Sequence, residues 1–66
     1  MNNFKTQLEL LLIAYLDSGT VTEQVARNLN ESEDFDDLEG RLISYLDSDM
    51  ITEEFGHNLI NATETL

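Results

Sequence analysis

Apolar residues recur along this chain at spacings of three and four, the period of a helix with one buried face. Four such stripes are separated by short polar breaks, and no stretch shows the alternation typical of a strand. The stripes consist of Phe4, Leu8, Leu11, Leu12 and Tyr15; Val21, Val25 and Leu29; Phe35, Leu38, Leu42, Tyr45 and Leu46; and Ile51, Phe55, Leu59 and Ala62. The pattern predicts an all-α fold of four short helices.

The polar breaks contain residues that commonly start and end helices. Gly19 follows the first stripe and suits a left-handed backbone, and Asp49 stands at the equivalent place after the third stripe. Thr22 and Thr52 are placed to begin the second and fourth helices, and Ser32 is placed to cap the third. The chain therefore predicts two units of helix, tight turn and helix.

The second half of the chain repeats the first half at an offset of 30 residues. Twelve of the 22 residues from Leu8 to Leu29 are identical to the residue 30 positions later. Such self-similarity marks a duplicated structural unit. The sequence therefore predicts one domain over residues 1–66, built from two helical hairpins at about residues 2–31 and 32–66 that are related by a pseudo-two-fold axis.

The turns of the two units read YLDSGTVTE at residues 15–23 and YLDSDMITEEF at residues 45–55. With the leucine-rich segments before them, they resemble the short helical hairpin of the SHOCT (short C-terminal) domain. That family has a Gly turn, an Ile-Thr helix start and an acidic-then-Phe opening. The first unit has Val25 in place of the Phe, and the basic residues usual in the family are missing. The resemblance implies a hairpin that mediates oligomerisation.

The chain is strongly acidic, because 14 Asp and Glu against three Lys and Arg give a formal net charge of −11. Binding to nucleic acid requires clustered Lys and Arg, whereas Lys5, Arg27 and Arg41 are scattered singly. The longest uncharged apolar run, Leu10–Leu16, is far shorter than the roughly 20 residues that span a bilayer. No signal-peptide pattern is evident. We therefore expect a cytoplasmic protein that binds neither nucleic acid directly nor membranes.

Six carboxylates are concentrated in nine residues where the first unit passes into the second: Glu31, Glu33, Asp34, Asp36, Asp37 and Glu39. The matching stretch of the first unit, residues 2–9, carries one acid and Lys5, so duplication does not explain this cluster. Two interpretations stay open: a binding surface for a basic protein, or charge that serves solubility. Mutual repulsion within the cluster should raise the pKa of some of these carboxyl groups.

The first helix is the most apolar of the four. Leu10 and Leu11 correspond to Gly40 and Arg41 of the second unit, and Ile13 extends the apolar surface further around the helix. A helix that is apolar on several faces requires burial. Either this helix lies at the centre of the other three, or Leu10, Leu11 and Ile13 form an interface with a partner or a second copy.

No group of residues in the sequence indicates catalysis or metal binding. The run Asp47–Asp49 could open a calcium loop, but Thr52 and Asn58 stand where such a loop requires Gly and Glu. His57, the only imidazole, lies one helical turn after two glutamates, an arrangement typical of surface ion pairs. We therefore expect a non-enzymatic chain without a metal or cofactor.

These features predict a small acidic protein-binding domain, an inhibitor or adaptor that binds a basic protein surface through the carboxylates of residues 31–39. In its sharpest form, the hypothesis describes a nucleic-acid mimic whose carboxylates occupy a site for phosphates. The alternative is an oligomerisation or scaffolding hairpin that acts through the apolar face of the first helix. Charge-driven binding should weaken as salt rises, whereas apolar association should persist.

Overall fold

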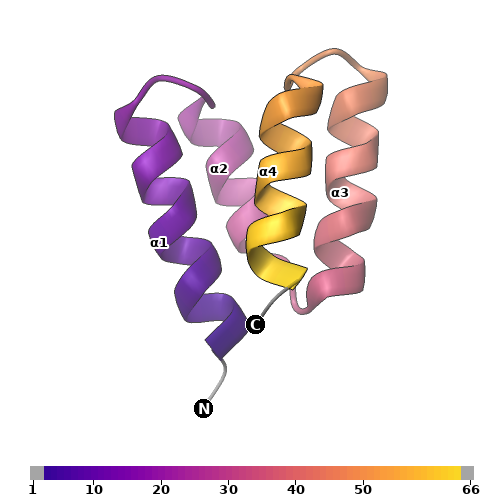
Figure 1. Cartoon of the computed structure of the whole chain (residues 1–66). Coiled ribbons are helices and arrows are strands. Elements are labelled where there is room, and N and C mark those ends of the chain that lie inside the picture. Colours follow the sequence, from indigo (N-terminus) through magenta and orange to yellow (C-terminus); the bar gives the residue numbers. More distant parts are fainter. Residues whose placement is uncertain (1–2, 65–66) are drawn as a thin grey trace.

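The computed structural model describes residues 3–64, and this part of the chain consists of four helices joined by short connections. They are α1 (Asn3–Asp17), α2 (Glu23–Asn30), α3 (Phe35–Asp47) and α4 (Glu53–Glu64). The helices run alternately up and down, so that the α1–α2 and α3–α4 turns lie at one end and the α2–α3 link lies at the other (Figure 1). The predicted all-α fold of four helices is confirmed.

Each helix packs against two others. α1 contacts α2 and α4, and α3 contacts α4 and α2, so the two hairpins meet along both of their helices. The start of α1 and the end of α4 lie at the same end as the α2–α3 link (Figure 1). None of the helices within residues 3–64 has the length and apolar character needed to cross a membrane.

The two hairpin turns have the same backbone geometry. Gly19 and Asp49 both adopt the left-handed conformation, with φ of 77° and 60°. In each turn the following residue donates its N–H to the carbonyl of the tyrosine five residues earlier, at 3.0 Å. Asp is among the few non-glycine residues that tolerate this backbone. The turn residues therefore adopt the conformation that the sequence indicated.

The helix starts follow the sequence at two places and differ from it at one. The hydroxyl groups of Thr22 and Thr52 accept the N–H of the residue three positions later, at 3.3 and 3.1 Å. The predicted cap Ser32 does not serve α3, which begins at Phe35 with Asp34 as its N-cap. Ser32 is fully buried, and its hydroxyl has no hydrogen-bond partner among the described residues. Burial of Ser32 moves the helix start two residues along the chain.

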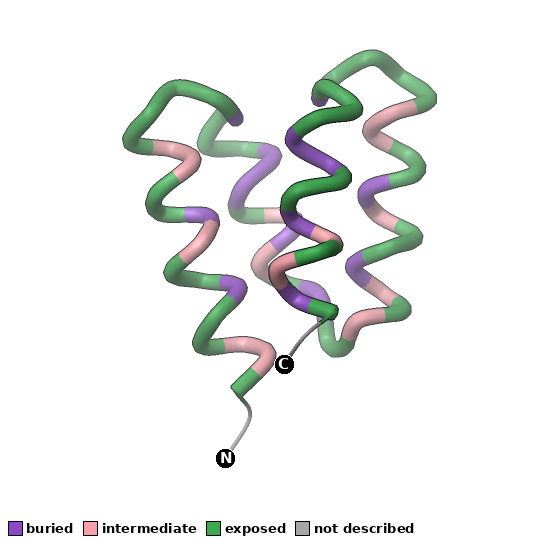
Figure 2. Tube along the Cα trace, in the orientation of Figure 1, coloured by how far each residue is buried: buried purple, intermediate pink, exposed green. Residues whose placement is uncertain are grey.

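The core lies where the four helices face one another, and the same positions of both hairpins fill it (Figure 2). Its members are Leu8, Leu12, Val21, Val25, Ala26 and Leu29 from the first hairpin and Leu38, Leu42, Ile51, Phe55 and Leu59 from the second. Tyr15 packs edge-on against Phe55 with ring centroids 4.8 Å apart, which joins α1 to α4. The pseudo-two-fold relation between the hairpins stays a prediction.

Candidate functional site

The six predicted acidic residues lie along the α2–α3 link and the first turns of α3. Glu31 is the C-cap of α2, Asp34 is the N-cap of α3, and Glu39 lies on the next turn of α3. All six except Asp37 are exposed. The fold therefore keeps them together on one short surface segment, residues 31–39, which we call the acidic segment.

Two members of the acidic segment stabilise the start of α3. The Asp34 carboxylate accepts the N–H of Asp37 at 2.8 Å. In return, Oδ2 of Asp37 accepts the N–H of Glu33 at 3.1 Å, and its Oδ1 accepts the Arg41 Nε–H at 3.3 Å. This reciprocal arrangement is close to a capping box, in which side chains satisfy the free amides of a helix start. An acid followed three residues later by a second acid is the sequence signal for it.

The Asp37 carboxyl group has a lowered pKa, which corrects the expectation from crowding. The Glu33 N–H contributes most, and the hydrogen bond and positive charge of Arg41 contribute next. Donors rather than neighbouring carboxylates face the Asp37 oxygens, and donors favour the charged form. Because the folded-state pKa is lowered, Asp37 stabilises the fold above its ordinary pKa, and this contribution is lost as the pH falls through the folded-state value.

Two of the three basic side chains bind main-chain carbonyls at the end of α2. Lys5 Nζ donates to the carbonyls of Asn30 at 2.5 Å and Ser32 at 2.8 Å, and Arg41 Nη1 donates to that of Asn28 at 2.8 Å. Carbonyls at a helix C-terminus carry partial negative charge and are stabilised by cations. Glu31 and Glu33 flank Ser32 in the chain, and both of their side chains are exposed.

The three residues of the predicted apolar site on α1 are not all exposed. Leu10 and Ile13 are 57% and 55% exposed, whereas Leu11 is half-buried and packs against the core. α1 packs against α2 and α4 and has an outer face in solvent, so it is not enclosed by the other three helices. An interface on α1 would therefore consist of Leu10 and Ile13, with Leu11 contributing to the fold.

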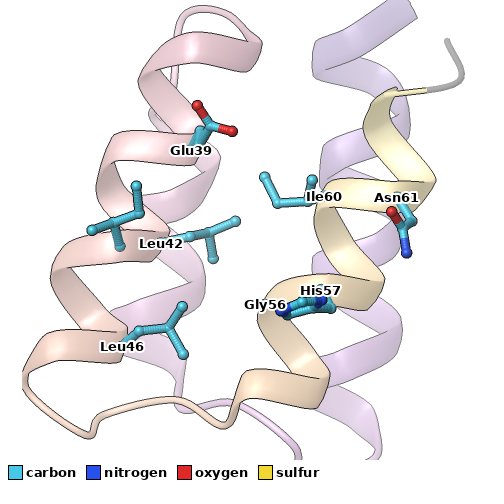
Figure 3. A pocket seen from close by; sticks show the side chains of 8 residues that line it. Glu39, Leu42, Leu46, Gly56, His57, Ile60 and Asn61 are labelled. Atoms are coloured by element: carbon cyan, nitrogen blue, oxygen red, sulfur yellow. The ribbon is translucent and has the colours of Figure 1, made fainter.

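The structure also contains a groove between α3 and α4 that the sequence did not indicate. One part of it is a hollow of about 190 Å³ lined by Glu39, Leu42, Ile43, Leu46, Gly56, His57, Ile60 and Asn61. Leu42 and Leu46 point from α3 toward α4, and Ile60 points back (Figure 3). A Cβ atom at Gly56 would lie 3.5 Å from Leu46 Cδ1, so glycine leaves space here. A glycine within an apolar helical stripe is the signal that could have revealed this α3–α4 groove.

The first hairpin has a smaller groove at the same positions. It measures about 110 Å³ and is lined by Glu9, Leu12, Ile13, Leu16, Ala26, Arg27 and Asn30. Ala26 stands where the second hairpin has Gly56, and Arg27 stands where it has His57. Arg27 forms an ion pair with Glu23 at 2.8 Å. The two grooves therefore differ in size and in charge.

The surface features of residues 3–64 are suited to binding another molecule. Within that range no group of three or more His, Asp or Glu side chains is placed to hold a metal ion. Comparison with protein-family models, with curated proteins and with solved structures gave no match. The features that remain to explain are the acidic segment, the exposed face of α1 and the α3–α4 groove.

Proposed function

We propose that this chain is a small protein-binding domain, an inhibitor or adaptor, that binds a basic protein surface through the acidic segment. The supporting observation is that all of its carboxylates except Asp37 are exposed, while its neighbours Lys5 and Arg41 donate to main-chain carbonyls. Complementary charge accelerates association and discriminates between partners. Glu31, Glu33, Asp36 and Glu39 are the contact residues.

The carboxylates of the acidic segment divide into two that stabilise the fold and four that are exposed for binding. Asp34 and Asp37 hold the start of α3 through backbone amides, so their replacement would disturb the fold. The other four carboxylates carry charge toward solvent at the end of α2 and along α3. In the sharper form of the proposal, the basic surface is one that otherwise holds nucleic-acid phosphates, because carboxylates carry negative charge as phosphates do.

The test compares two charge-matched double variants. Glu33→Gln/Asp36→Asn removes two acids from the acidic segment, and Asp17→Asn/Glu54→Gln removes two exposed acids at the opposite end of the molecule. A partner isolated by crosslinking is purified and titrated with each variant. We expect the first variant to slow association about tenfold at low salt and the second less than about twofold, with the difference vanishing near about 0.5 M salt. Equal effects of the two variants would contradict the proposal.

A second candidate function is oligomerisation through α1, which is favoured by the exposed side chains of Leu10 and Ile13. The variant Leu10→Gln/Ile13→Gln leaves the core residue Leu11 in place, so it separates interface from fold. If α1 forms a homodimer, sedimentation should show a dimer that this variant converts to a folded monomer. A wild-type chain that is monomeric at high micromolar concentration would exclude the homodimer.

A further inference from the structure

The α3–α4 groove combines an apolar floor with acidic ends. Beside the first hollow, a second hollow is lined by Leu46, Asp47, Asp49, Ile51, Thr52, Glu53 and His57. The two hollows share Leu46 and His57, so they form one groove along α3 and α4. Glu39 lies at one end, and the carboxylates of residues 47, 49 and 53 lie at the other.

The groove of the first hairpin is lined by the equivalent positions but differs in size and in charge. Both hairpins contribute the same positions to the core, yet Arg27 on the α1–α2 groove is paired with Glu23, whereas His57 replaces it on the α3–α4 groove. Likewise, the second groove has Ile60 at the position where the first groove has Asn30. The second groove is therefore larger, and it lacks the arginine of the first.

The α3–α4 groove is continuous with the acidic segment. Asp36, Glu39 and Ile43 are spaced by three and four residues on α3, so they follow one face of that helix. Glu39 belongs to the acidic segment and also lines the first hollow. Ile43 lines the first hollow as well and is 54% exposed. A single partner segment can therefore contact both features.

The charge of this surface decides between its potential occupants. A second copy of the chain would bring another net charge of −11 to a groove with acidic ends, which disfavours self-association. The hollow of about 190 Å³ continues into the second hollow of about 590 Å³, which has carboxylates in its lining. These properties suit one large apolar side chain with cationic neighbours.

We propose that the α3–α4 groove binds a basic peptide segment of the partner, which inserts one large apolar side chain among Leu42, Leu46 and Ile60. Lys or Arg residues on both sides of that anchor face Glu39 at one end and Asp47 and Glu53 at the other. This inference rests on the proposed function and assigns the chemistry of the partner. At many protein interfaces, a few side chains buried in pockets contribute most of the binding energy, and the contacts around them exclude water.

A displayed library of randomised peptides, selected against the immobilised full chain, tests this assignment without a known partner. Selected peptides are synthesised and titrated against Ile43→Ala and against the matched control Ile13→Ala, which removes an equally exposed isoleucine from the first groove. A third variant, Gly56→Ala, narrows the α3–α4 groove with the residue that the first hairpin has at that position. Alanine is a better helix former than glycine, so weaker binding by this variant would not reflect unfolding.

We expect the selected peptides to contain Lys or Arg on both sides of a large apolar residue. Their affinity should fall at least about fivefold in Ile43→Ala and Gly56→Ala and less than about twofold in Ile13→Ala. Selection of basic peptides that lack an apolar residue and bind all three variants equally would contradict binding in the groove. The proposed function would then still stand. Selection of peptides without basic enrichment would overturn both. Greater sensitivity to Ile13→Ala would place the site on the first hairpin instead.

Discussion

Asp36 and Asp37 are adjacent in the chain, yet their carboxylates have different surroundings. Asp37 accepts the Glu33 N–H and the Arg41 side chain, whereas Asp36 is exposed to solvent. The first is held by donors that favour its charged form, and the second adds to the repulsion within a strongly acidic molecule. Their replacement by asparagine should therefore have opposite effects on stability.

We predict that Asp37→Asn lowers the melting temperature at neutral pH, whereas Asp36→Asn leaves it unchanged or raises it. The pKa of Asp37 is lowered in the fold, so its contribution is present near neutral pH and is lost as the pH falls through the folded-state value. The difference between wild type and Asp37→Asn should thus shrink in acid. Thermal melts of both variants across this range provide the measurement, and equal melting temperatures at neutral pH would contradict it.

Sequence reasoning identified the acidic segment but not the roles within it. Ser32 and Asp34 are both good N-cap residues, and the spacing alone does not choose between them. The choice follows from tertiary packing, because Ser32 is fully buried within the α2–α3 link. Gly19 and Asp49 were predictable because left-handed turns restrict the residue type locally.

At the scale of elements, Lys5 attaches α1 to the α2–α3 link. Its ammonium group donates to carbonyls 25 and 27 residues away in the sequence. Arg41 does the same from α3 to the last turn of α2. The helical spacing of residues in a sequence does not reveal contacts between residues so far apart. The sequence therefore showed these cations only as scattered charges. The α3–α4 groove was not predicted because Ile43 lies outside the apolar stripe of its helix and Gly56 was not recognised as a residue that leaves space.

We predict that Lys5→Met destabilises the fold by about 2 kcal/mol, a typical cost for the loss of hydrogen bonds from a charged group. Methionine retains an apolar stem, so the change mainly removes the ammonium group. Arg27→Met is the matched control, since it removes a cation from an exposed ion pair, and it should cost less than about 0.5 kcal/mol. Urea denaturation of both variants measures the difference. Similar costs would show that the Lys5 contacts contribute little.

At the scale of the whole molecule, acidic charge opposes compaction. Fourteen acids and three basic residues share a chain of 66 residues, and the cations of Lys5 and Arg41 lie close to one end of α2. The all-α architecture was predictable because the core residues of each helix recur at spacings of three and four along the chain. Net charge contributes to association and solubility without specifying the fold.

We predict that the melting temperature at neutral pH rises by several degrees between about 20 mM and 0.5 M salt, because salt screens repulsion among the exposed carboxylates. The control is Glu33→Gln/Asp36→Asn, whose smaller charge should reduce the rise. A salt-independent melting temperature would show that the carboxylates are too well separated to affect stability.

The up-and-down arrangement also has a consequence for chain connectivity. The start of α1, the end of α4 and the α2–α3 link share one end of the molecule, and α1 packs on α4 as α2 packs on α3 (Figure 1). The two hairpins could thus follow each other in either order along the chain and still pack in the same way. A circular permutant that joins the end of α4 to the start of α1 and opens the chain beside the acidic segment should retain the same core. New termini at that point would allow a fluorophore or a fusion partner to be attached next to the proposed binding surface.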